Sequence, residues 1–282
     1  MKNKNVSVIT GGAGGFGRGA AIELGKKGIL LLGDFNSEAL AKAKAELEVL
    51  NIEVYTMKMD VRDQKSCEEF AAYATKLGNV KVVVNIAGVC PMLSYTDAPI
   101  SSPELTYTTN SIGTMYITDA FFNVMSEGGV LINFASMAGH LFPLDSNKID
   151  VFDSCYEEDF LNRLMELSLI EGAPEYNLSS AAYCTSKAFV LHYTKKNTKR
   201  FAEKGCRIFS ISPGAHYTKH IEILPDEIRT RTLNAQAILR WGKTWEMGEI
   251  IGFLCNDSSG FMTGTDILVD GGAVSISSTK QL

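Results

Sequence analysis

The sequence lacks the features of a secreted, membrane-spanning or nucleic-acid-binding protein. No stretch approaches the roughly 20 consecutive apolar residues of a membrane-spanning helix. The N-terminus, MKNKNVSVITGG, passes from a short polar lead directly into an apolar strand, so we expect no secretory signal and a cytoplasmic location. The net charge is -5, and basic residues are scattered among acidic ones, which leaves no continuous positive surface for phosphates. We expect neither membrane nor nucleic acid as a partner.

Cysteine and histidine are too scattered to indicate a metal site. The six cysteines form no C-x-x-C pair and have no histidine at metal-ligand spacing, and the four histidines have no such spacing either. We therefore expect reduced thiols and no metal. Cys184 follows Tyr183 directly, but no histidine base is near it in the sequence, so we interpret it as a small buried side chain.

Length and apolar content indicate one α/β domain over residues 1–282. A chain of 282 residues with 45% hydrophobic content suffices for one buried core and is short for two. Apolar, β-branched runs alternate with helical patterns, and almost continuously hydrophobic strands are typical of a parallel sheet covered on both faces. We expect a Rossmann-type, doubly wound fold. The expected strands are 5–10, 29–34, 52–59, 80–85, 129–136, 206–212 and 266–270, and the expected helices include 37–50 with Ser37 as N-cap, 63–78, and one near 245–255.

The interval 140–180 interrupts this alternation. It is acidic and contains the amphipathic stretch EEDFLNRLMELSLI, in which Phe160, Leu161, Leu164 and Leu167 line one face. A solvated helix at the edge of the domain and a wall of the active site both explain it. Residues 274–282 are expected to form a C-terminal tail.

A glycine-rich turn, TGGAGGFG at 10–17, lies between the first strand and a helix expected to begin near Phe16. Gly11, Gly15 and Gly17 suit a tight turn whose backbone approaches a pyrophosphate and lets the helix pack on the strand. Such a turn is weak evidence when it stands alone.

Asp34 ends the second expected strand, 17 positions after Gly17, where the ribose of a bound dinucleotide would lie. A carboxylate there accepts hydrogen bonds from ribose hydroxyls and repels a 2′-phosphate, which favours NAD over NADP. Arg18 is the one nearby cation that weakens this inference. The alternative is that Asp34 is only a polar residue at the end of a strand.

Tyr183 and Lys187, in SSAAYCTSKAF, stand four positions apart in what is expected to be the start of a helix. Residues at this spacing meet on any helix surface, so spacing alone does not separate a catalytic pair from a structural one.

The chain as a whole resembles the short-chain dehydrogenases/reductases over about residues 5–273. Six features carry the resemblance: the glycine turn at 10–17; Asp60-Val61; Asn85-Ile-Ala-Gly88, in which Ile86 replaces the second asparagine of the family's N-N-A-G; Asn110 in TNSIG; Ser136; and Tyr183-x-x-x-Lys187. Pro213-Gly214 with Thr218, RWG at 240–242 and TGTDILVDGG at 263–272 complete it. The interval 140–180 lies outside it.

This resemblance implies hydride transfer between a secondary alcohol and a nicotinamide. Tyr183 would act as general acid or base and Ser136 would orient the substrate oxygen. Lys187 would favour the phenolate and bind the nicotinamide ribose, and Asn110 would hold a water that links Lys187 to solvent. The implied NAD-binding residues are Gly11, Gly15, Phe16, Gly17, Asp34, Phe35, Asp60, Val61, Asn85, Ala87, Gly88, Tyr183, Lys187, Pro213, Gly214, His216 and Thr218.

Ser136 and Tyr183 are 47 residues apart, against little more than a dozen in most of the family. This resembles bacterial hydroxysteroid dehydrogenases with an insertion at the same point, so a hydroxysteroid or bile acid is the favoured substrate. A smaller alcohol or a sugar is the alternative, and a non-catalytic nucleotide-binding scaffold is the alternative from another class. We expect the insertion to form a helical wall over the substrate. We also expect it to alter the usual helix contact of a homodimer or homotetramer.

Overall fold

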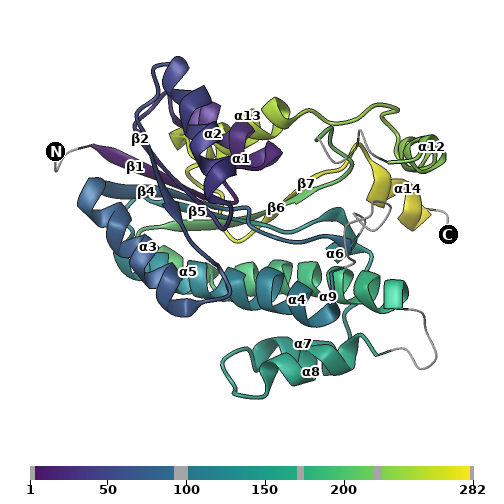
Figure 1. Ribbon diagram of the computed structural model, residues 1–282. Helices are drawn as coiled ribbons and strands as arrows, with labels where there is room; N and C mark the ends of the chain where they lie inside the picture. Colours follow the sequence, from purple (N-terminus) through teal and green to yellow (C-terminus); the bar gives the residue numbers. More distant parts are fainter. Residues whose placement is uncertain (1–3, 92–100, 170–174, 219–220, 222–223, 280–282) are drawn as a thin grey trace.

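Seven parallel strands form the centre of the molecule in the computed structural model, which describes residues 4–91, 101–169, 175–218, 221 and 224–279 (Figure 1). The strand order is β3-β2-β1-β4-β5-β6-β7, and every pairing is parallel. The expected doubly wound fold is confirmed. The strands are β1 (Asn5–Thr10), β2 (Ile29–Asp34), β3 (Val54–Lys58), β4 (Asn79–Asn85), β5 (Val130–Phe134), β6 (Arg207–Pro213) and β7 (Asp266–Val269).

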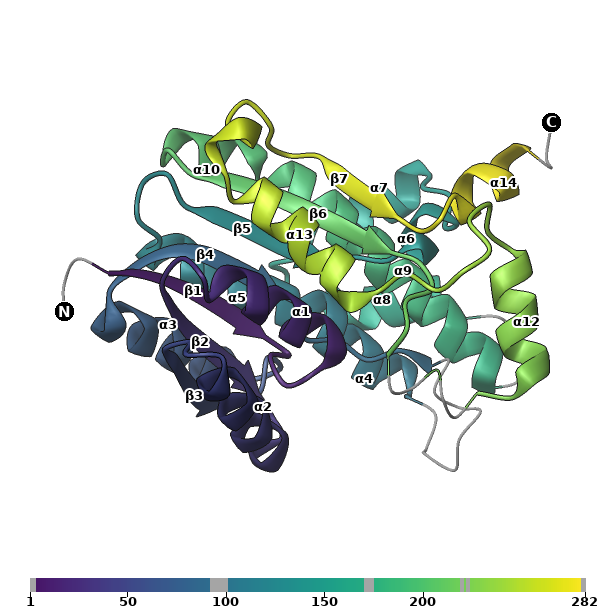
Figure 2. The same ribbon diagram turned by 90° about the horizontal axis from the view of Figure 1, so that it is seen from above.

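Helices cover both faces of the sheet, as Figures 1 and 2 show. Successive strand residues point to opposite faces, so Val8 packs toward one helical layer and Ile9 toward the other. One layer consists of α1 (Gly15–Leu24), α2 (Ser37–Val49) and α13 (Thr244–Leu254). The other contains α3 (Gln64–Leu77), α4 (Pro103–Tyr107), the π-helical turn η2 (Thr108–Ile112), α5 (Gly113–Val124), α9 (Glu175–Lys196) and α10 (Thr198–Glu203).

Several element ends differ from the sequence-based expectation. Asn36, not Ser37, is the N-cap of α2, because its side chain accepts a hydrogen bond from the Ala39 N–H at 3.0 Å. The helix that carries Tyr183 begins at Glu175, so the tyrosine lies well inside α9. Helix α14 (Ala273–Thr279) covers the described part of the expected tail, and both carboxylate oxygens of the buried Asp270 accept N–H groups at its start.

The described part of the 140–180 interval forms short helices: α6 (Met137–His140), α7 (Ser146–Asp153) and α8 (Phe160–Leu167). In Figure 1, α7 and α8 lie below α4 and α9, as a layer farther from the sheet. Phe160 and Leu164 are buried there against Phe189 and Tyr193 of α9, and Leu161 and Leu167 pack partly buried against the same cluster. The apolar stripe is therefore covered by its own subunit.

The described part of the interval packs on α9, and the expectation of a wall over the substrate stays a prediction. Ala182, Phe189 and Tyr193 of α9 belong to the same buried cluster as Phe160 and Leu164 of α8. Tyr183 and Lys187 lie on a different face of α9, because adjacent helical residues point about 100° apart. Apolar burial between helices positions α8. The expected assembly into a dimer or tetramer stays a prediction.

No helix in the described ranges combines the length and the apolar content needed to cross a bilayer.

Candidate active site

The glycine turn lies where the strand order reverses, beside the ends of β1 and β4. Gly11 has a φ of +64°, and a Cβ on it would lie 3.0 Å from the Ala87 backbone nitrogen, so glycine is required on both counts. Helix α1 has no side-chain cap at Gly14 and no acidic residue in its first turn. Its N–H groups and positive dipole end therefore suit a pyrophosphate. The turn fits a dinucleotide.

Asp34 ends β2 next to this turn. Its Oδ2 accepts a hydrogen bond from the Ala13 N–H at 3.3 Å, and its Oδ1 accepts one from the Asn36 N–H at 3.1 Å. Arg18, the cation that weakened the inference of NAD, forms an ion pair with Glu46 of α2 at 2.7 Å. Its charge is therefore partly neutralised by a neighbouring helix that sequence spacing did not reveal.

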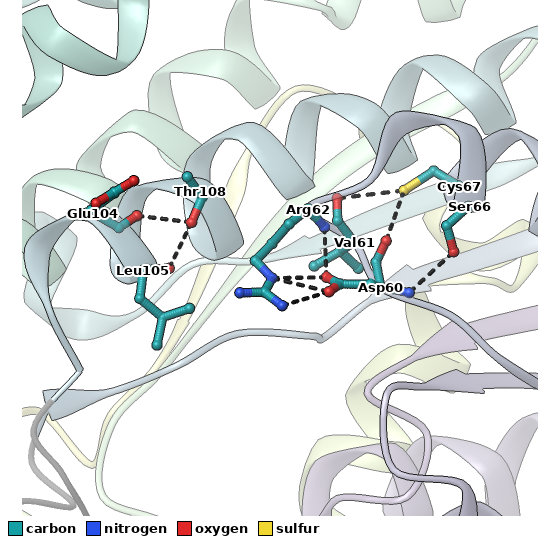
Figure 3. Close-up of polar contacts among 8 residues, drawn as sticks. All are labelled: Asp60, Val61, Arg62, Ser66, Cys67, Glu104, Leu105 and Thr108. Carbon is teal, nitrogen blue, oxygen red and sulfur yellow. Dashed lines mark hydrogen bonds and ion pairs between the residues drawn. The ribbon is translucent and has the colours of Figure 1, made fainter.

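Asp60 and Val61 follow β3 in a turn that α3 and α5 hold in place. The Asp60 N–H donates to Ser66 Oγ at 3.1 Å, and Val61 is buried against Gly113 of α5. The Asp60 carboxylate pairs with the guanidinium of Arg62, a residue that the sequence motif did not include (Figure 3). The hydrogen bond from the Arg62 side chain lowers the pKa of Asp60 below its ordinary value.

Asn85 belongs to a buried polar network beneath the site. Its Oδ1 accepts the Thr10 hydroxyl at 2.7 Å, and its Nδ2 donates to Asn133 Oδ1 at 3.3 Å. Thr10 Oγ1 also accepts the N–H groups of Ile86 and Ala87, at 3.1 and 3.2 Å. Asn85 therefore joins β1, β4 and β5 from within, and Thr10 shapes the loop that follows β4. Thr10 and Asn133 are polar residues within apolar strands, and this was the sequence signal that could have predicted the buried network.

Ser136 and the Tyr183/Lys187 pair meet between α6 and α9. Ser136 caps α6, and its Oγ accepts the Ala138 N–H at 3.2 Å. The Ser136 hydroxyl lies close enough to the Tyr183 phenol to lower its pKa. Lys187 is 5% exposed, and its Nζ donates to the Phe134 carbonyl at 2.8 Å, at the end of the strand that leads to Ser136. The structure thus brings three of the four expected catalytic side chains together.

Burial dominates the proton affinities of this pair. It raises the pKa of the Tyr183 phenol well above its ordinary value of 10.0, although the Ser136 hydroxyl offsets part of the effect. Burial also lowers the pKa of Lys187 from 10.5 to about 8. Desolvation is the largest cause of both shifts. The expected role of Lys187 in favouring the phenolate stays a prediction.

Cys90 is a neighbour that the sequence argument missed. Its thiol hydrogen-bonds the Tyr183 side chain and raises the pKa of that phenol further. Its position two residues after Gly88, in a loop already assigned to the cofactor, was the available signal.

Asn110, the fourth expected catalytic residue, is 1% exposed and lies in the π-helical turn η2. Its side chain accepts the Val89 N–H at 2.9 Å and donates to the Val89 carbonyl at 3.0 Å and to Ser186 Oγ at 3.2 Å. A Cβ on Gly88 would lie 3.0 Å from Asn110 Oδ1 and 3.5 Å from Lys187 Nζ. Asn110 therefore fixes the loop beside Lys187, and its expected role in holding a water stays a prediction.

The loop after β6 closes onto the glycine turn. Thr218 lies against Gly15, where a Cβ would be 3.2 Å from Thr218 Cγ2. The buried His216 ring packs edge-on to Phe16, with centroids 5.2 Å apart, and its Nδ1 contacts the Gly214 carbonyl at 3.1 Å. Burial lowers the pKa of His216, so the ring is neutral at physiological pH. Pro213 ends β6 at this edge, whereas Phe35 beyond Asp34 is 74% exposed.

Histidine, cysteine and carboxylate side chains form no cluster that would hold a metal ion within the described ranges.

Comparison with known proteins identifies the family. A model described as short chain dehydrogenase matches residues 5–145, half of the chain, and one described as Enoyl-(Acyl carrier protein) reductase matches residues 163–274. The chain belongs to the short-chain dehydrogenase family. Residues 146–162, which include all of α7, lie between the two matches.

Two relatives of this short-chain dehydrogenase differ in substrate. The 7alpha-hydroxysteroid dehydrogenase of Escherichia coli (strain K12) is 23% identical over 273 residues, covering 95% of this chain and 93% of the relative. The L-rhamnose 1-dehydrogenase (NAD(P)(+)) of Sphingomonas sp. (strain SKA58) is 26% identical over 280 residues, covering 96% of each.

A solved structure of an actinorhodin polyketide ketoreductase variant with NADPH matches with a TM-score of 0.73 at 22% identity. The match covers 97% of this chain and 99% of that one. It shows the shared fold.

Proposed function

We propose that this short-chain dehydrogenase interconverts a secondary alcohol and its ketone with NAD, and that Tyr183 transfers the hydroxyl proton. The observation that carries the proposal is the meeting of the Ser136 and Tyr183 hydroxyls beside Lys187, at the sheet edge where the glycine turn also lies. A nucleotide-binding scaffold has no need for this hydroxyl pair.

The nicotinamide, when bound, supplies the hydride acceptor or donor and, when oxidised, a positive charge. Ser136 donates a hydrogen bond to the substrate oxygen and fixes its distance from Tyr183. Tyr183 takes the hydroxyl proton in oxidation and returns it in reduction. Lys187, held by the Phe134 carbonyl, stabilises the phenolate that forms.

NAD is the proposed cofactor because a carboxylate stands at the ribose position and Arg18 is paired with Glu46. Asp34 would accept the ribose hydroxyls, and Gly11, Gly15 and Gly17 would admit the pyrophosphate. Thr218 and Gly214 would bind the carboxamide end. The full set of cofactor-binding residues is the one given from the sequence.

A hydroxysteroid or bile acid is the proposed substrate, supported by the resemblance and by the hydroxysteroid dehydrogenase relative. The described part of the 140–180 interval packs on α9 and adds no support for an apolar roof. A sugar is the second candidate, because the rhamnose dehydrogenase is a relative of similar identity.

The test is formation of NADH, followed by its absorbance, with a panel of hydroxysteroids, bile acids, sugars and short secondary alcohols. Turnover of steroids in preference to sugars supports the substrate class, and the reverse order favours the second candidate. Tyr183→Phe serves as the control for catalysis at this site. Binding of NADH without turnover of any alcohol or ketone would instead indicate the scaffold.

A further inference from the structure

The loop 214–218, which follows β6, is held by the side chain at its centre. The His216 ring is 6% exposed. Its Nδ1 lies 3.1 Å from the Gly214 carbonyl oxygen, and Nδ1 carries the hydrogen because a carbonyl only accepts. The ring also packs edge-on to Phe16 at the start of α1, with centroids 5.2 Å apart. One side chain therefore joins this loop to the glycine turn.

The segment before α13 is shaped around the same ring. A Cβ on Gly242 would lie 2.5 Å from His216 Cδ2 and 2.6 Å from its Nε2, so the ring occupies the space that a side chain at position 242 would need. The Gly242 N–H donates to the Ala215 carbonyl at 3.0 Å, and the Tyr217 N–H donates to the Gly242 carbonyl at 2.7 Å. The ring thus lies between α1, its own loop and the backbone of Gly242.

A proton on Nε2 would place a positive charge in this buried position. Arg240 and Glu246 act on the ring from the segment next to it, but they form a bidentate ion pair at 2.6 and 2.9 Å, which leaves little net charge. Asp270 packs on Gly214, and its carboxylate oxygens accept N–H groups at the start of α14. The start of α1 faces the ring with an aromatic side chain. These described neighbours therefore offset little of the cost of a buried charge.

Burial accordingly lowers the pKa of His216 below its ordinary value of 6.5. A ring released into solvent takes up a proton near its ordinary pKa, and the held ring does so only at lower pH. The released form then binds more protons, so a fall in pH below 6.5 favours release. Above that pH the ring is neutral in both forms, and the held form keeps its full stability.

We propose that His216 is a positioning residue of this dehydrogenase: its neutral ring holds the loop 214–218 against the start of α1, where the loop receives the nicotinamide, and a proton on the ring releases the loop. The inference rests on the proposed function, in which Gly214 and Thr218 of this loop bind the carboxamide end. It assigns an acid limit of cofactor binding to a group outside the proton-transfer set.

The first experiment measures binding of NAD and of ADP-ribose to the wild-type protein by calorimetry, from about pH 7.5 down to about pH 4.5. ADP-ribose contains both riboses, the adenine and the pyrophosphate but lacks the nicotinamide, so it corrects for groups that titrate elsewhere in the site. We expect the ratio of the two dissociation constants to shift against NAD by about threefold or more, because one proton changes affinity by up to about tenfold per pH unit. An unchanged ratio would overturn the proposal.

The second experiment repeats the series with two matched variants that do not titrate in this range. His216→Asn keeps a donor for the Gly214 carbonyl, and His216→Phe keeps a ring against Phe16. Each loses one contact, so NAD binding at neutral pH should weaken by up to about tenfold. The ratio of NAD to ADP-ribose should no longer depend on pH. The melting temperature verifies that each variant is folded at each pH.

Failure of this proposal and failure of the proposed function give different results. A wild-type protein that binds NAD with a pH-independent ratio refutes the role of His216 and leaves the proposed function standing. The same holds if His216→Phe keeps the pH dependence of the wild type, because the proton then binds elsewhere. If one variant does not fold, the other variant and the wild-type series still decide. A wild-type protein that binds no NAD at neutral pH would refute both.

Discussion

The Tyr183 hydroxyl lies between two groups with opposite effects on its pKa. Burial raises the pKa most, the Cys90 thiol raises it further, and the Ser136 hydroxyl lowers it. The phenol is therefore protonated at neutral pH, so it is available as a general acid, whereas the phenolate needed for a general base is scarce. The charge of the oxidised nicotinamide is what the proposed mechanism adds to shift this balance toward the phenolate.

The direction of this pKa shift predicts different pH profiles for the two directions of reaction. Oxidation requires the phenolate, so kcat/KM for the alcohol should rise with pH through the neutral and mildly alkaline range. Reduction requires the neutral phenol, so its rate should stay nearly flat over that range.

Tyr183→Phe should lower turnover by roughly 10³-fold or more while NADH binding is retained. Near-normal turnover in this variant would refute proton transfer by Tyr183.

Cofactor choice is a second property of single residues. Asp34→Ala should shift the ratio of kcat/KM for NADP over NAD upward by about tenfold, which corresponds to about 1.4 kcal/mol. Glu46→Gln should shift it in the same direction, because it releases Arg18 from its ion pair. Steady-state kinetics with both cofactors measures the ratio. A wild-type protein that uses NADP as well as NAD would contradict the assignment.

At the level of elements, the junction of α6 and α9 sets the geometry of the site. Gly139 packs directly on the backbone of α9, where a Cβ would lie 2.8 Å from the Lys187 carbonyl carbon and 2.9 Å from the Ala188 nitrogen. At the end of α6, His140 contacts Asp266 at 2.8 Å and Ser212 at 3.2 Å, which ties the helix to β7 and β6. Both contacts hold α6 in place, and with it Ser136 at the start of the helix.

Gly139→Ala should separate α6 from α9 and move Ser136 away from Tyr183. Because a misplacement of about 1 Å can cost about 10²-fold, we expect kcat to fall ten- to a hundredfold, with little change in NADH binding. Leu164→Ala is the matched control: it should cost 2–5 kcal/mol of stability in the α8 core, yet leave kcat nearly unchanged. If both variants lose kcat in proportion to stability, the contact has no special role in positioning.

The strands were predictable because their apolar runs are almost unbroken and each ends near a glycine or polar residue. The run 29–34, for example, matches β2 at both ends. The positions of Ser136 and Tyr183 at one sheet edge followed from the family resemblance. The pairing of Arg62 with Asp60 and of Arg18 with Glu46 did not, because half-exposed ion pairs depend on side-chain direction and leave no periodic signal.

At the scale of the whole molecule, the packing of α7 and α8 on the outside of α9 was also beyond prediction. The stripe on α8 indicated that a face must be buried, and its own subunit, the substrate or a partner could each have covered it. Contacts distant in sequence decide between them: Phe160 packs on Phe189, with ring centroids 5.3 Å apart, and the Tyr156 hydroxyl donates to Asp119 of α5 at 3.1 Å. Amphipathicity identifies the buried face and not its partner.

The buried Lys187 links the active site to the stability of the whole protein. Its pKa is lowered from 10.5 to about 8, so both folded and unfolded states carry the proton below pH 8, and the folded state bears the cost of a buried charge. Between about 8 and 10.5 only the unfolded state stays protonated. The unfolded state then binds more protons, and the contribution of Lys187 to the free energy of unfolding rises with pH across that window.

Lys187→Met keeps the length of the side chain and removes the charge. At neutral pH the variant should be more stable than the wild type by on the order of 1–3 kcal/mol while losing activity. The difference should shrink as pH rises from about 8 toward 10.5. It should then reverse, because a neutral amine can still donate to the Phe134 carbonyl and Met cannot. The free energies of unfolding of both proteins are measured by urea unfolding without added cofactor, at neutral pH and near the upper end of this window. Other groups titrate in both proteins, so their effects cancel in the difference. A difference that does not change with pH would mean that Lys187 is not buried as a charge, and its ammonium could not then exert the proposed effect on Tyr183.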